Sequence, residues 1–133
     1  MNPAGLPNWS ESFSQVVITH TGSSRTIHIS GQVAVDASNR TVAPGDLAGQ
    51  AAHAFANLGR ALQAAGATPE DVVRLGIYVV NYEPTQAGII REALRRVFTS
   101  DRLPASTWLG VAALALPDLL IEVEATAIVE SLS

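Results

Sequence analysis

The sequence predicts a single α+β domain in which a mixed β-sheet carries two helices on one face. Three observations support this prediction. The chain has 133 residues, 47% of them are hydrophobic, and segments with strand-like composition are interleaved with two segments of helical periodicity. This length is typical of one domain, and this apolar content is enough to bury a core. The predicted order of elements is β-β-α-β-α-β-β.

The first two strands are expected to form a hairpin. Residues 16–19 (Val-Val-Ile-Thr) are strong strand formers, and Thr21-Gly22-Ser23-Ser24 is a turn signal. A second strand follows over 25–35, where Ile27 and Ile29 alternate with polar residues. One face of this strand is therefore apolar and the other polar.

The first helix is predicted from Asp46, as N-cap, to about Ala65. Gly66 stands where a left-handed C-terminal cap is expected, and Thr68-Pro69-Glu70-Asp71 is typical of a capped single turn. One apolar face recurs at helical spacing. It consists of Leu47, Ala51, Ala54, Phe55, Leu58, Leu62 and Ala65.

The second half of the chain predicts a strand, a helix and two further strands. Residues 72–80 form an apolar run typical of a strand covered on both faces. A helix over about 84–99 would turn Ile90, Leu94, Val97 and Phe98 inward. Residues 106–116 and 119–129 are the last two strands, separated by a Leu116-Pro117-Asp118 turn.

The sheet face away from the helices is expected to be an interface. The segment 109–116 is too apolar to face water, and a contiguous apolar sheet face usually marks a contact between molecules. We therefore expect a homo-oligomer with closed symmetry.

Composition excludes several classes of chemistry. The chain has no cysteine, and all eight basic residues are arginine, so thiolate nucleophiles, cysteine zinc sites and lysine Schiff bases are excluded. A net charge of −4 argues against binding nucleic acid, and no apolar run is long enough for a membrane helix. His20, His28 and His53 lack metal-ligand spacing, so no metal site is expected. The N-terminus does not read as a secretory signal, and the expected location is the cytoplasm.

Short segments along the whole chain carry a family resemblance. In chain order they are Phe13-Ser14-Gln15, Ile29-Ser30-Gly31-Gln32, Ala64-Ala65-Gly66, Asp71-Val72-Val73-Arg74, Leu103-Pro104-Ala105, Gly110-Val111-Ala112 and Ile121-Glu122-Val123-Glu124-Ala125. In this order and spacing they resemble the Rid (YjgF) family of reactive-intermediate deaminases, as one domain over 1–133.

The resemblance implies a chorismate-mutase-like fold and a homotrimer whose sheets form a central barrel. It also implies pockets for a small-molecule ligand between the subunits. Deaminase members of this family hydrolyse reactive enamines and imines, such as 2-aminoacrylate, to keto acids and ammonia. They use no metal and no cofactor.

Three positions match the family's site. Glu122 matches the first glutamate of the closing strand and is the candidate catalytic residue, since a carboxylate can position a water for attack on a C=N carbon. Ser30 matches the serine of the Ser-Gly-Gln element and is a candidate for hydrogen bonding to ligand. Phe13 stands where a tyrosine is usual and is a candidate for contact with the substrate. The alternative for Glu122, and for Glu124 on the same strand face, is a solvated carboxylate.

Three other positions depart from the pattern. Ser106 replaces the arginine that binds the substrate carboxylate in the deaminases, and a hydroxyl cannot supply a bidentate cationic clamp. Trp108 stands where a small residue is common, so it is either a stacking wall for a planar ligand or a filler of core or interface. Arg91 takes the place of an asparagine and could restore the lost guanidinium, or it could belong to a solvated stripe with Arg95 and Arg96.

Two functions therefore stay open. The first is a cofactor-independent hydrolase of an enamine, imine or related C–N bond, for which the standard 2-imino acids are doubtful substrates because Ser106 replaces the arginine. The second is a non-catalytic trimer that binds or senses a small metabolite, or that regulates a partner. RNA cleavage is poorly supported by an acidic chain with no lysine and few aromatic residues.

Overall fold

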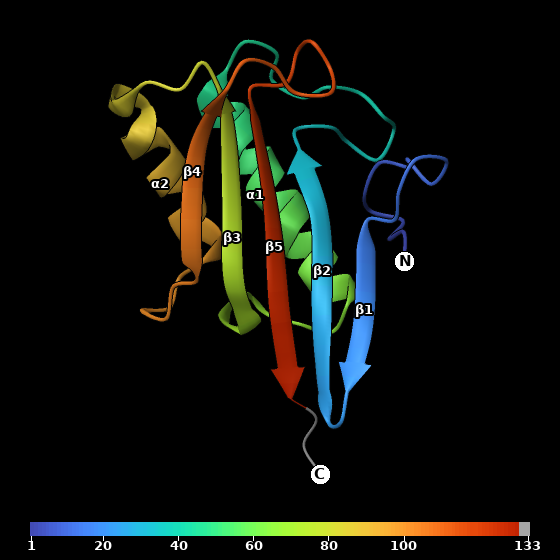
Figure 1. Ribbon diagram of the computed structural model, residues 1–133. Helices are drawn as coiled ribbons and strands as arrows, with labels where there is room; N and C mark the ends of the chain where they lie inside the picture. Colours follow the sequence, from blue (N-terminus) through green and yellow to red (C-terminus); the bar gives the residue numbers. More distant parts are fainter. Residues whose placement is uncertain (131–133) are drawn as a thin grey trace.

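The computed structural model describes residues 1–130 and has the predicted order of elements. A 3₁₀ turn precedes the third strand and another precedes the second helix (Figure 1). The elements are β1 (Val16–Thr21), β2 (Ser24–Val33), α1 (Leu47–Ala64), η1 (Pro69–Asp71), β3 (Val72–Val80), η2 (Pro84–Gln86), α2 (Ala87–Val97), β4 (Ala105–Val111) and β5 (Ile121–Glu130).

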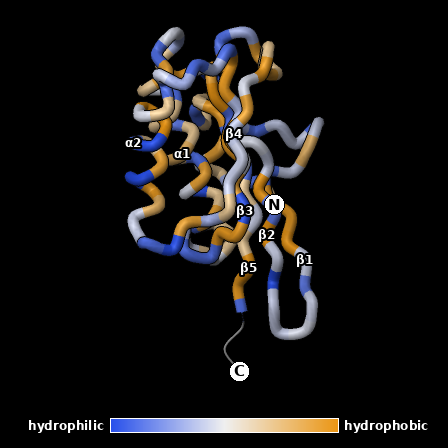
Figure 2. Tube along the Cα trace, turned by 60° about the vertical axis from the view of Figure 1, so that its left-hand side comes forward, coloured by the Kyte–Doolittle hydropathy of each residue, from blue (hydrophilic) through white to orange (hydrophobic). Residues whose placement is uncertain are grey.

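The five strands form one mixed sheet in the order β1-β2-β5-β3-β4. Strands β3 and β4 are parallel, and the other neighbours are antiparallel. The last strand in the sequence thus lies in the middle of the sheet, while β1 and β4 form its two edges. Both helices lie on the same side of the sheet, as Figures 1 and 2 show, which confirms the predicted architecture.

Both helices bury the faces that their periodicity predicts. Phe55, Leu58 and Leu62 of α1 and Ile90 of α2 are fully buried against the sheet. The Asp46 side chain accepts a hydrogen bond from the Gly49 N–H and caps α1. Gly66 adopts a φ of 76° just after α1, the left-handed conformation that glycine adopts without strain.

The sheet face opposite the helices differs from the prediction. Residues 106–116 do not form one strand, because β4 ends at Val111 and the following residues form a loop. Strand β3 is covered by helices on one face only, and its exposed Arg74 and half-buried Tyr78 lie on the open face. Exposed Leu109 lies there among polar side chains such as Arg74 and Glu124, so this face is not contiguously apolar. The homotrimer stays a prediction.

Two buried amides of α1 hold irregular backbone near the ends of β2 and β5. Gln50 donates to the Asp118 carbonyl and accepts from the Leu120 N–H, each at 2.8 Å. Asn57 donates to the Val33 and Val35 carbonyls at 2.9 and 3.1 Å. A buried backbone group without such a partner is costly, so these amides fix the loops that flank both strands.

Within residues 1–130, no helix combines the length and the apolar character needed to cross a lipid bilayer.

Replacement of Gln50 by leucine tests the role of these amides. Gln50→Leu leaves the Asp118 carbonyl and the Leu120 N–H without their hydrogen-bond partner. We expect the substitution to lower the free energy of unfolding by about 1–3 kcal/mol. Urea unfolding followed by circular dichroism measures the difference. Gln63→Leu on the exposed side of α1 is the matched control. Equal stability of the two variants would contradict the proposed role of Gln50.

Candidate functional site

A β-bulge in β2 places Gly31 beside Glu122. Ile29 pairs with Ala125 and Gln32 pairs with Val123, so β2 advances three residues where β5 advances two. A Cβ atom at position 31 would lie 2.5 Å from Cδ of Glu122, closer than two unbonded carbons can approach. The absence of a side chain at Gly31 therefore allows the Glu122 side chain to lie against the sheet.

The bulge is held in place by the segment that leads into β1. The Ser30 N–H donates to the Gln15 carbonyl at 2.9 Å, and the Ser30 hydroxyl donates to the Ser14 carbonyl at 2.6 Å. The buried side chains of Gln32 and Gln15 bond to each other at 2.7 Å. Ser30 thus positions the bulge, and its expected contact with a ligand stays a prediction.

Glu122 lines a recess of about 220 Å³. Phe13 lines the same recess, so the structure brings together two of the residues that the sequence singled out. Glu122 is the one ionisable side chain among the described residues of this lining. The other lining residues are mainly apolar: Trp9, Ser12, Gly31, Val33, Ala115, Leu116 and Leu119.

Burial raises the pKa of the Glu122 carboxyl above its ordinary value, and the negative charge of Glu124 adds to this effect. The Glu122 carboxyl makes no hydrogen bond to any residue in 1–130 that could counter the rise. Its oxygens are free to accept protons from a bound molecule. A carboxylate with a raised pKa is a stronger base than an ordinary one, which suits proton transfer near neutral pH.

Arg91, Ser106 and Trp108 line a different recess, between α2 and β4. The register pairs Ser106 with Leu75 and Trp108 with Ile77, so both side chains lie on the helix-covered side of the sheet. The Trp108 indole N–H donates to the Ser106 hydroxyl at 3.1 Å. Within one chain, the structure therefore does not bring these three residues to Glu122.

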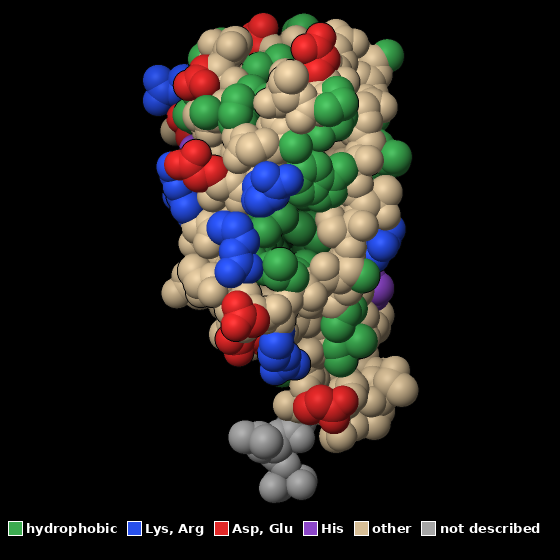
Figure 3. All heavy atoms as spheres, turned by 90° about the vertical axis from the view of Figure 1, so that its left-hand side faces the viewer, with side chains coloured by type: hydrophobic (Ala, Val, Ile, Leu, Met, Phe, Trp, Pro, Cys, Tyr) green, Lys and Arg blue, Asp and Glu red, His purple; other side chains and the backbone are tan. Residues whose placement is uncertain are grey.

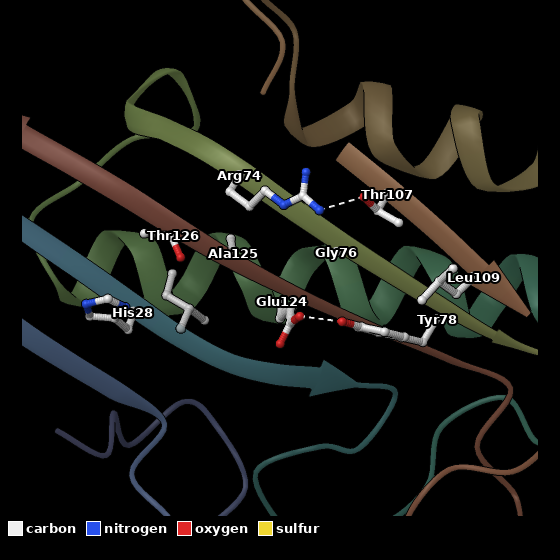
Figure 4. Close-up of a pocket in the computed structure, with 10 residues that line it drawn as sticks. His28, Arg74, Gly76, Tyr78, Thr107, Leu109, Glu124, Ala125 and Thr126 are labelled. Carbon is white, nitrogen blue, oxygen red and sulfur yellow. Dashed lines mark hydrogen bonds between the residues drawn. The ribbon is translucent and has the colours of Figure 1, made fainter. Parts of the chain in front are cut away.

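A recess of about 360 Å³ lies on the open face of the sheet (Figure 4). The Tyr78 hydroxyl donates to Glu124 at 2.5 Å, and Arg74 donates to the Thr107 hydroxyl at 2.6 Å. The hydrogen bond to Glu124 raises the pKa of Tyr78 above its ordinary value. His28 also borders this recess.

Sequence reasoning missed most of the walls around Glu122. Trp9 comes from the irregular N-terminal segment, and Leu116 and Leu119 come from the loop between β4 and β5. These parts of the chain are about 100 residues apart, and no local periodicity links them. No signal in the sequence points to these walls. Gly31 indicates only that another group approaches the backbone closely, and that group is the Glu122 side chain.

Comparisons with known proteins agree on one family. A family model described as Endoribonuclease L-PSP matches residues 6–129. The rat 2-iminobutanoate/2-iminopropanoate deaminase is 34% identical over 116 residues, which cover 87% of this chain and 79% of the rat protein.

Two solved structures have the same fold. A protein of unknown function of the Rid family, YyfB from Yersinia pestis, is 43% identical with a TM-score of 0.77 and covers 97% of this chain and 96% of its own. The Escherichia coli YjgF gene product is 26% identical with a TM-score of 0.77, and the match covers 96% of this chain and 95% of the YjgF chain.

The raised pKa of Glu122 predicts a cost to stability at neutral pH. The folded state binds the Glu122 proton more tightly than the unfolded state does. The contribution of Glu122 to stability is therefore most favourable at pH values below the ordinary pKa of a glutamate and is lost as the pH rises through the raised pKa. The neutral Glu122→Gln should be more stable than the wild type at pH 7, with the difference shrinking toward acid pH.

Urea unfolding between pH 3.5 and 8 tests this expectation, with the exposed Glu11→Gln as control. Parallel stability profiles for the wild type and Glu122→Gln would show that the Glu122 pKa is not raised by folding.

Proposed function

This chain belongs to the Rid (YjgF, endoribonuclease L-PSP) family, and on that premise we propose that it hydrolyses the C=N bond of a small imine or of an enamine through its imine tautomer. One observation carries the proposal. Glu122 is a half-buried carboxyl in an apolar recess, with a raised pKa and oxygens free of internal partners. The names of related mammalian proteins, which are 2-iminobutanoate/2-iminopropanoate deaminases, support the reaction class.

The proposed reaction is a proton relay through Glu122. The Glu122 carboxylate takes a proton from a water as the water oxygen bonds to the imine carbon. The π electrons of the C=N bond move to the nitrogen, which takes the proton from Glu122 and becomes an amine, leaving Glu122 as a carboxylate again. Glu122 then accepts the proton of the water-derived hydroxyl and passes it to the nitrogen as the C–N bond breaks, so the nitrogen leaves as ammonia. Imine and water become a carbonyl compound and ammonia, with no change of oxidation state.

We also propose that the chain acts as a homotrimer. In a ring of identical subunits, each contact is heterologous, so one edge of a subunit meets the opposite edge of the next. The Glu122 recess lies on the side of β2 and the N-terminal segment, whereas Arg91 and Trp108 lie at the β4 edge. Such a ring would let the β4 edge of one copy complete the Glu122 recess of its neighbour.

Ser106 sets the expected limit of this activity. The family resemblance places a carboxylate-binding arginine at this position, and the serine hydroxyl is exposed and bonded to Trp108. A hydroxyl lacks the charge and fork geometry that bind a carboxylate in a bidentate way. We therefore propose that short 2-imino acids are weak substrates. A non-catalytic role in metabolite binding or regulation is the alternative, and it predicts saturable binding without product.

Glu122→Gln tests the proposed function. The substrates are freshly generated 2-iminopropionate and 2-imino-3-phenylpropanoate. The readout is the loss of imine, measured as the fall in the amount of imine that semicarbazide can still trap. We expect at least a 100-fold fall in kcat for the variant, because the amide cannot accept a proton. Glu130→Gln, an exposed position on the same strand, is the control.

A no-protein sample and Ser106→Arg complete this test. Equal rates for the wild type and the no-protein sample on both imines would overturn the proposed hydrolysis. A high wild-type rate on 2-iminopropionate, unchanged in Ser106→Arg, would overturn the argument from Ser106.

A further inference from the structure

The recess between α2 and β4 combines an apolar lining with arginine side chains. It has a volume of about 240 Å³, and Leu94, Leu103, Pro104 and Trp108 supply apolar surface. Figure 3 views this edge of the molecule and shows hydrophobic side chains gathered beside a border of basic ones. A recess of this size is smaller than a typical drug-sized pocket and fits one ring-sized group.

Arg91 is the free charge of this recess. It makes no hydrogen bond or ion pair with the residues that the structure describes, whereas Arg96 on the same helix pairs with Glu92 at 2.9 Å. Arg95 donates to the Ser100 carbonyl at 3.0 Å, so it is partly engaged. No acidic side chain in 1–130 lines the recess. In a chain of net charge −4, the recess therefore carries a local excess of positive charge.

Trp108 gives the recess a fixed wall. Its indole N–H donates to the Ser106 hydroxyl, which orients the ring and occupies the one polar group of the indole. The Ser106 hydroxyl accepts in this bond and keeps its own O–H to donate. Trp108 itself therefore offers apolar surface next to the Arg91 guanidinium, a combination that favours an apolar group attached to a single carboxylate.

We propose that this recess selects carboxylates that carry a bulky apolar group, with Arg91 binding the carboxylate and Trp108 packing against the apolar part. The proposal rests on the proposed function and names its substrate class: 2-imino acids, and the enamines related to them, with an aryl or branched alkyl side chain. In the head-to-tail ring, this recess would hold the substrate beside the Glu122 of the neighbouring copy. A second copy of the chain is the competing occupant.

A binding experiment tests the recess without any turnover. Calorimetric titrations would use 3-phenylpropionate, with 3-phenylpropan-1-ol and propionate as probes that each lack one feature. We expect saturable binding of 3-phenylpropionate and at least tenfold weaker binding of the other two. Arg91→Gln should lower the affinity for 3-phenylpropionate at least tenfold and leave the affinity for the alcohol unchanged. Trp108→Ala should lower the affinity for both compounds. Arg96→Gln, on the same helix but outside the recess, should bind as the wild type does.

A kinetic experiment connects the recess to the reaction. We expect kcat/KM for 2-imino-3-phenylpropanoate to exceed that for 2-iminopropionate at least tenfold in the wild type, and Arg91→Gln to abolish the preference. Light scattering of the wild type and Arg91→Gln completes the set, and we expect the same mass for both.

The outcomes separate the two proposals. Binding that follows Arg91 without turnover of either imine would overturn the proposed function and leave the recess as a binding site. Equal kcat/KM values for the two imines, unchanged in Arg91→Gln, would overturn this inference and leave the proposed hydrolysis standing. A changed mass for Arg91→Gln with unchanged affinity would show that the recess is a contact between copies, which also overturns the inference.

Discussion

Gly31 lies beneath the Glu122 side chain because β2 contains one more residue than β5 across the bulge. That contact decides the position of the carboxyl group. Without a Cβ at position 31, Glu122 lies close to the sheet and inside an apolar recess, where burial disfavours its charge and raises its pKa. The hydrogen bonds of Ser30 hold the bulge from one side, and the Gln50 amide holds the segment before β5 from the other.

The residues of the proposed site lie apart within one chain. The candidate base is on β5, in the middle of the sheet, in a recess that β2 and the N-terminal segment line, while the Arg91 guanidinium and the Trp108 indole lie at the β4 edge. A single chain therefore offers a proton acceptor with few means of holding a substrate, and the proposed anion-binding group without a base beside it. A ring in which opposite edges meet would join the two, which gives a chemical reason for the proposed trimer beyond the burial of sheet surface.

The helices and strands could be predicted because each has its own periodicity. The apolar face of α1 and the alternation around Ile27 in β2 are local signals, and the structure confirms both. The length of β4 was overestimated because an apolar run such as 109–116 serves equally as strand or as loop lining a recess. Glu122 was identifiable from its place in the family pattern. The raised pKa depends on burial of the carboxyl in a recess that Trp9 and Leu119 also line, and only the fold brings these residues together.

A titration of the Glu122 carboxyl tests the central claim most directly. Carbon-13 NMR of glutamate-labelled protein would follow this carboxyl with pH in the wild type and in Gly31→Ala, with the helical Gly59→Ala as control. The account predicts a midpoint above the ordinary value in the wild type and in Gly59→Ala. In Gly31→Ala it predicts a midpoint that returns toward the ordinary value, because the new methyl group displaces the carboxyl toward solvent. An ordinary midpoint in the wild type, or the same midpoint in all three proteins, would contradict it.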